Sequence, residues 1–277
     1  MSGRLSHIMN AVYCEPWLIR PEMHQTISGI VQEHVKGVAH LEAGCAATFE
    51  LPGVKEESRI RMVEDVAVIS FDGVVGKRVG MLEKTSGVLD LDDFAADLEK
   101  VASDDGVDGI VLDINSPGGT VTGTPEAADM VAKCRKRVVA YSETMCASAA
   151  YWVASQAYAF IAAPSAVVGS IGVYLPLSDR SRLYEMNGVK QHLIKAGKYK
   201  GIGVDGTAPT EEMLERLQDR VDFIHAEFKA AVRAGRGNIA DEHMEGQDFF
   251  GKQAEQIGLV DSIGTLAQAI RLAAGNK

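Results

Sequence analysis

The chain has 277 residues, of which 46% are hydrophobic and 24% charged, enough apolar material for one large domain or two small ones. Its formal net charge is −10 and its basic residues are scattered, which argues against a nucleic acid or an anionic membrane as partner. No stretch resembles a signal peptide or a membrane anchor, so we expect a cytoplasmic protein. The four cysteines form no CxxC pair, and we expect neither disulfides nor a metal site. They are Cys14, Cys45, Cys134 and Cys146.

Residues 1–60 differ in pattern from the rest of the chain and predict an appended N-terminal arm. A short helix is expected over 22–37, followed by an irregular stretch. Residues 61–277 are then expected to form the main domain.

From residue 66 onward, apolar strands alternate with helices. The expected strands are 66–75, 109–115, 137–143, 159–164, 167–174 and 190–197. The expected helices are 91–106, capped by Asp90, and 125–136, 148–157, 210–235 and 264–275. Strands that are apolar on both faces and separated by helices predict an α/β fold, with a mainly parallel sheet covered by helices. Chemistry in such sheets collects at the carboxyl ends of the strands.

The first candidate for chemistry is the segment "DINSPGGTVTG", residues 113–123, which follows an expected strand. Pro117 fixes one backbone angle, while Gly118 and Gly119 permit positive φ, so the turn can direct backbone N–H groups at an anion. It would then form half of an oxyanion hole. The alternative is an ordinary strand-to-helix turn.

The second candidate is Ser148, at the first turn of an apolar helix. A nucleophile there is stabilised as it gains charge, because free N–H groups point outward from a helix start. The alternative is that Ser148 only caps the helix. Cys146 is a stronger intrinsic nucleophile, but no histidine lies in the neighbouring motifs to activate it, and we interpret it as a small buried residue.

The third candidate is the base. None of the seven histidines lies in a recognisable triad context, and the G-x-S-x-G motif is absent. The segment "IKAGKYKG", residues 194–201, offers Lys195, Lys198 and Lys200, and a buried neutral lysine can deprotonate a serine. Solvated loop lysines are the alternative. The G-x-G-x-x-G pattern at 201–206 is discounted as a nucleotide site, because no helix starts where a pyrophosphate would need it.

Five ordered segments resemble the S49 serine peptidases, the signal peptide peptidase A group, over residues 64–272. They are "DINSPGG", "CASAAYWVAS…AFIAAPSAVVGSIGVY", "IKAGKYKG", "EFKAAVRAGRG" and "GQDFFGKQAEQIGLVDSIGTLAQAI". The resemblance implies a ClpP/crotonase-like fold with Ser148 as nucleophile and Lys200 as base. It also implies oxyanion donors from the backbone of Gly118 or Gly119 and of Ala149, and no cofactor.

The leader "EPWLIRPEMHQTISGIVQEHV" resembles the phage branch of the family, the capsid assembly proteases. The resemblance implies a serine endopeptidase that processes scaffold, portal or minor head proteins, in the host cytoplasm or inside the procapsid. A closed homo-oligomer is expected, in which a neighbouring subunit completes each site. Three alternatives stay open: a cellular signal-peptide-peptidase-like protease, a non-catalytic scaffolding relative and a crotonase-type enzyme acting on acyl-CoA.

Overall fold

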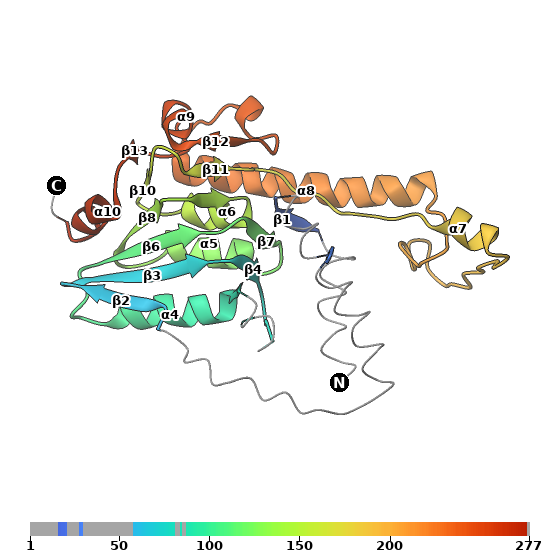
Figure 1. Ribbon diagram of the computed structural model, residues 1–277, viewed down its shortest axis with the longest axis horizontal. Coiled ribbons are helices and arrows are strands. Elements are labelled where there is room, and N and C mark those ends of the chain that lie inside the picture. The colour runs from blue at the N-terminus through green and yellow to red at the C-terminus, as the bar shows by residue number, and fades with distance from the viewer. Residues whose placement is uncertain (1–15, 21–27, 30–57, 81–83, 85–86, 276–277) are drawn as a thin grey trace.

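A six-stranded sheet forms the centre of the computed structural model, which describes residues 16–20, 28–29, 58–80, 84 and 87–275 (Figure 1). The strand order is β13-β10-β8-β6-β3-β2, and every neighbouring pair is parallel except β2 with β3. The bounds are β2 Ile60–Val63, β3 Val66–Asp72, β6 Gly109–Asn115, β8 Arg137–Ser142, β10 Ala159–Ala162 and β13 Ser262–Ile263. The predicted α/β fold with a mainly parallel sheet is confirmed.

Both faces of this sheet are buried by helices. One face packs against α4 (Leu91–Ser103), α5 (Thr124–Ala132) and α6 (Ala149–Ala154), and its central residues include Ile69, Ile110 and Leu112. The other face packs against α10 (Leu266–Ala273). Alternate residues of the strands face opposite sides, which is why these strands are apolar throughout.

Two smaller sheets lie beyond the carboxyl ends of the central strands. One has the order β1-β7-β4-β5 and the other β12-β11-β9. Their bounds are β1 Trp17–Ile19, β4 Val74–Gly76, β5 Val88–Asp90, β7 Gly118–Thr120, β9 Met145–Ala147, β11 Val167–Gly169 and β12 Asp248–Phe250. Since β4, β7, β9 and β11 directly follow β3, β6, β8 and β10, the small sheets gather at the edge where chemistry was expected.

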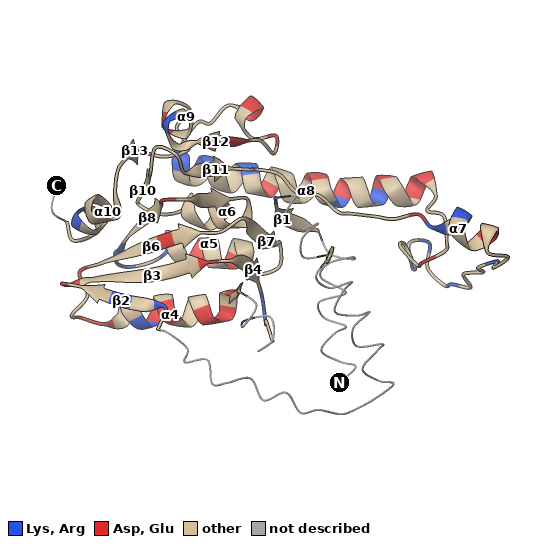
Figure 2. Ribbon diagram, in the orientation of Figure 1, with Lys and Arg blue, Asp and Glu red and all other residues tan. Residues whose placement is uncertain are grey.

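The long helix α8 (Glu211–Arg236) begins within a projection, next to the part that carries α7, and ends against the body (Figure 1). We call residues 178–210 the projecting segment; it carries α7 (Ser181–Met186) and lies at the end of α8 remote from the sheets. Figure 2 shows both signs of charge along α4 and α8. Two short helices, η1 (Asp241–His243) and α9 (Gly251–Gln256), follow α8. None of the helices in the described part of the chain has the length and apolar character that a bilayer crossing requires.

Two sequence-based expectations are corrected here. The strand expected over 190–197 is absent, because this stretch is irregular and exposed and has no neighbouring strand. The strand expected over 167–174 is regular only in β11, and Tyr174 makes an isolated bridge with Trp17. Apart from the helical Ser28 and Gly29, the helix expected over 22–37 lies outside the described residues.

Candidate active site

Ser148 lies in a strained turn between β9 and α6. Its backbone angles are φ 55° and ψ −117°, a region that non-glycine residues rarely adopt. Its side chain makes no capping hydrogen bond to α6, so capping does not explain the serine. Strain of this kind concentrates at functional sites, and a strained strand-to-helix turn is how α/β-hydrolases present a nucleophilic serine. The geometry is that of a nucleophile elbow without the glycines of the usual motif.

The surrounding structure holds this turn in place. The Ser148 N–H donates to the Gly169 carbonyl at 2.8 Å, and the Ser148 carbonyl accepts from the Trp152 N–H at 2.9 Å. All six residues of α6 are buried, and the Trp152 ring stacks on Phe228 of α8 with centroids 4.6 Å apart. The core therefore supports the strained residue from its strand side and from its helix side.

The Pro-Gly-Gly turn lies against Ser148. Gly118 has φ 100°, and a Cβ at this position would lie 2.9 Å from the Cβ of Ser148 and 2.1 Å from the carbonyl oxygen of Leu18. No larger residue fits. The N–H of Gly118 donates to Ser116 Oγ at 3.2 Å, while Gly119 pairs with Val75 on one side and Leu18 on the other.

The third expected donor, Ala149, is the first residue of α6. The N–H groups of a first helical turn have no partner within the helix. The Ala149 N–H therefore lies outside the hydrogen-bond ladder of the helix, and the Gly118 N–H is bonded to a side-chain hydroxyl and not to a neighbouring strand.

A second strained serine lies at the neighbouring strand end. Ser170 follows β11 with φ 53°, and the register of β11 with β9 places Gly169 opposite Ala147. Ser148 and Ser170 therefore leave adjacent strands at the same edge. Sequence patterns gave no sign of Ser170, because positive φ at a serine has no sequence signature.

Cys146 is not available as a nucleophile. Its side chain is 0% exposed, and burial raises the pKa of its thiol well above the usual value. A buried apolar thiol stays protonated and unreactive. This agrees with the interpretation of Cys146 as a small buried residue.

The three candidate lysines all lie on the exposed projecting segment. Lys195 Nζ donates to the Lys198 carbonyl at 2.7 Å, and Lys198 pairs with Glu212, whose hydrogen bond raises the Lys198 pKa. In Figure 1 the stretch between α7 and α8 that carries Lys200 lies away from α6. Within one chain, the structure does not bring Lys200 to Ser148, and the strand expected over 190–197, just before Lys200, is absent.

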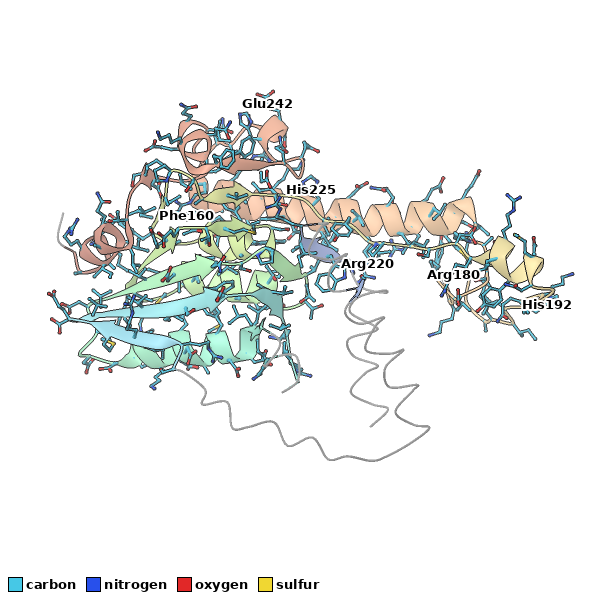
Figure 3. The ribbon with its side chains drawn as sticks, viewed as in Figure 1. Phe160, Arg180, His192, Arg220, His225 and Glu242 are labelled. Atoms are coloured by element: carbon cyan, nitrogen blue, oxygen red, sulfur yellow. The ribbon has the colours of Figure 1, made fainter. Side chains whose placement is uncertain are left out.

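Two of the three described histidines, His192 and His225, make no hydrogen bond to Ser148. His225 Nε2 lies 2.7 Å from the Met244 carbonyl and 3.2 Å from that of Ile171, a structural role between α8 and the body. His192 lies at the tip of the projecting segment (Figure 3). The described residues hold no cluster of three or more histidines, cysteines or carboxylates that would suit a metal ion.

Comparison with known proteins gives a family match. The sequence profile of peptidase family S49 matches residues 131–277. A predicted protease of Methanocaldococcus jannaschii is 37% identical over 180 residues, 63% of this chain and 57% of its own length. Capsid assembly protease C of Escherichia phage lambda is 29% identical over 284 residues, covering 96% of this chain and 64% of its own length.

A third relative is the head-tail preconnector protein of Enterobacteria phage P21, 30% identical over 293 residues, 99% of this chain and 58% of its own length. The chain thus spans about three-fifths of the length of these curated relatives. The matched profile includes Ser148, its elbow helix and the projecting segment, and the α/β architecture is that of the ClpP-like fold expected for the group. The chain belongs to peptidase family S49.

Proposed function

We propose that the chain is a serine endopeptidase with Ser148 as its nucleophile. The observation that carries this proposal is the strained elbow, which holds a buried serine without any capping bond. Ser148 Oγ attacks the peptide carbonyl carbon while its proton passes to a base. The base returns the proton to the amine as the C–N bond breaks, and water then releases the acyl group by the same steps.

The backbone N–H of Ala149, with that of Gly118 or Gly119, would stabilise the oxyanion that forms. Ala149 directly follows the nucleophile, and Gly118 lies against its Cβ. Donors placed this close to a developing negative charge typically supply the largest single contribution to catalysis. For Gly118 to contribute, its N–H would have to exchange the hydroxyl of Ser116 for the substrate oxygen.

Lys200 is the proposed base, supplied by a neighbouring copy of the chain. The projecting segment exposes several apolar side chains beside it, including Ile194, which is 98% exposed. A neighbouring copy would bury these side chains and also desolvate the amine, which a base at neutral pH requires. A dyad shared between subunits reconciles the exposed lysine with the buried serine.

The proposed substrates are polypeptides, and capsid assembly is the favoured setting. Both named phage relatives align with nearly the whole chain, 96% and 99% of it, so the alignments include most of the first 60 residues. We therefore favour cleavage of scaffold, portal or minor head proteins in the host cytoplasm or procapsid. A cellular signal-peptide-peptidase-like protease is the second candidate, since Protease 4 of Salmonella typhi is 28% identical over 76% of this chain.

A fluorophosphonate probe tests this function, because such probes react only with an activated serine. We expect the wild-type chain to be labelled at Ser148 and the Ser148→Ala variant to remain unlabelled. A folded wild-type protein that takes no label would favour the non-catalytic scaffolding alternative. Calorimetric binding of coenzyme A would instead favour the crotonase-type alternative.

A further inference from the structure

A segment of the N-terminal region lies against the candidate active site. β1 pairs antiparallel with β7, with Leu18 opposite Gly119 and Ile19 opposite Gly118. Gly118 lies so close to Ser148 that a Cβ added at Gly118 would be 2.9 Å from the Cβ of Ser148. A segment about 100 residues earlier in the chain therefore runs along the strand that borders the proposed nucleophile.

The other edge of β1 is paired as well. The Trp17 N–H donates to the Tyr174 carbonyl at 2.8 Å, and the Tyr174 N–H donates to the Trp17 carbonyl at 3.1 Å. β1 is thus held as an extended strand between β7 and the stretch after β11. Backbone pairing with side chains in apolar pockets is the general way in which proteins bind an extended peptide by strand addition.

This strand takes up the space that a substrate would need. The carbonyl oxygen of Leu18 and the Cβ of Ser148 both approach the same side of Gly118. Ser148 is only 1% exposed with β1 in place. A scissile carbonyl must come within about 3–3.5 Å of the attacking oxygen, so a substrate and β1 compete for this position.

One attachment of the segment, at Arg20, can be weakened without changing its buried side chains. β1 has only three residues, and Arg20, just after it, pairs with Asp248 of β12 at 3.2 Å. The Arg20 N–H also donates to the Pro117 carbonyl at 3.3 Å. A strand this short separates from its neighbours at a smaller cost than a long one.

We propose that residues 16–20 occupy the docking position of an extended polypeptide substrate, so that β7 and Tyr174 form a peptide-binding edge closed by the chain's own strand. The inference rests on the proposed function of Ser148. Because Trp17, Leu18 and Ile19 are all buried in this position, the edge accepts polypeptides with consecutive apolar side chains. Displacement of β1 opens the site.

The first test compares the rates of fluorophosphonate labelling in full-length variants. Arg20→Ala removes the ion pair with Asp248, whereas Arg233→Ala removes an ion pair of 2.7 Å between the last turn of α8 and Asp241 of η1. We expect Arg20→Ala to label about threefold to tenfold faster than wild type and Arg233→Ala to label at the wild-type rate. Equal rates in all three proteins would overturn the proposal.

The second test does not depend on catalysis. A fluorescein-labelled peptide Glu-Pro-Trp-Leu-Ile-Arg-Pro-Glu, the sequence of residues 15–22, is titrated against Ser148→Ala with and without Arg20→Ala. We expect about threefold to tenfold tighter binding when Arg20 is replaced, since the tethered strand competes less well. Methylation of the backbone nitrogen of the peptide's Trp removes the N–H that donates to the Tyr174 carbonyl, and it should abolish binding.

The two tests separate the two proposals. If no protein is labelled but the peptide binds as expected, the proposed nucleophile is wrong and the docking edge stands. If Ser148 is labelled at one rate in all variants and the methylated peptide binds as well as the plain one, the docking edge is wrong and the nucleophile stands.

Discussion

Ser148 shows how a single residue can report function through its backbone. A left-handed φ with ψ −117° costs on the order of 1–3 kcal/mol at a non-glycine residue. The buried α6 and the pairing of β9 with β11 hold this conformation in place. The sequence predicts a serine at a helix start, but the strain itself depends on tertiary packing.

The strain gives a stability prediction. Glycine adopts the backbone angles of Ser148 without penalty, whereas alanine keeps the strain and loses the hydroxyl. We expect Ser148→Gly to be more stable than Ser148→Ala by about 1 kcal/mol in urea unfolding at fixed protein concentration. Both variants should lose peptidase activity. A more stable alanine variant would mean that residue 148 is not strained in solution.

A second residue-level prediction concerns Asp113 on β6. Burial raises the pKa of its carboxyl above 3.8, with Glu143 and Asp72 adding to the effect and Arg61 opposing it. The folded state therefore binds the proton more tightly, and stability falls as the pH rises from about 3.8 through the raised pKa. Asp113→Asn removes this loss.

We expect Asp113→Asn to stabilise the protein by about 0.5 kcal/mol at pH 7, with the difference shrinking toward pH 4. Urea unfolding at several pH values measures it. Asp93 gives the opposite control: burial raises its pKa, but the bonds from Lys84 and Arg59 outweigh this and lower it. Asp93→Asn should therefore destabilise the protein at pH 7.

At the scale of elements, local patterns predicted the helices better than the strands. Asp90 caps α4 as expected, accepting the Asp92 N–H at 3.0 Å. The apolar residues at helical spacing in α4 are buried, namely Leu91, Phe94, Leu98 and Val101. The irregular stretch 190–197 was wrongly expected to be a strand, because an apolar pattern does not reveal whether a neighbouring strand is present. β1 was missed for the converse reason, since its partner lies about 100 residues away.

Asp90 gives an element-level prediction, because its carboxylate holds the turn at Arg78 and Val79 as well as the start of α4. It also accepts the N–H groups of Arg78 at 3.1 Å and Val79 at 3.0 Å, and it lies 3.4 Å from Lys84 Nζ. Asp90→Ala would leave these donors without their acceptor, so we expect a loss of about 3 kcal/mol in urea unfolding. Asp90→Asn should lose less.

The matched control is Thr210, which caps α8 with one exposed bond to the Met213 N–H at 3.3 Å. Thr210→Ala should cost about 1 kcal/mol. If Asp90→Ala were no more damaging than Thr210→Ala, the turn at Arg78 and Val79 would not depend on Asp90.

At the scale of the whole molecule, the projecting segment and not α6 offers the surface that the expected oligomer would bury. The apolar helix α6 offers no surface to a partner, because all six of its residues are buried within the chain. The projecting segment, in contrast, exposes Met186 and Ile194. These side chains suit burial against a second copy, in which Lys200 would meet a neighbour's Ser148.

Complementation tests this arrangement. Ser148→Ala and Lys200→Ala should each be inactive alone, because one lacks the nucleophile and the other the base. Co-expression gives mixed assemblies in which a site is intact when one copy supplies Ser148 and its neighbour supplies Lys200. Random mixing then predicts about a quarter of wild-type activity per chain on a casein or scaffold-derived peptide, and the activity should fall on dilution as the assembly dissociates.

The controls for this experiment use the other lysines. Lys195→Ala and Lys198→Ala should keep their activity, while Lys200→Arg should fail, since a guanidinium remains protonated at any accessible pH. Sedimentation of the wild-type protein should show species larger than the 29.7 kDa monomer. Activity that survives in a monomer, or co-expressed variants that stay inactive although they assemble, would place the base of each site within its own chain.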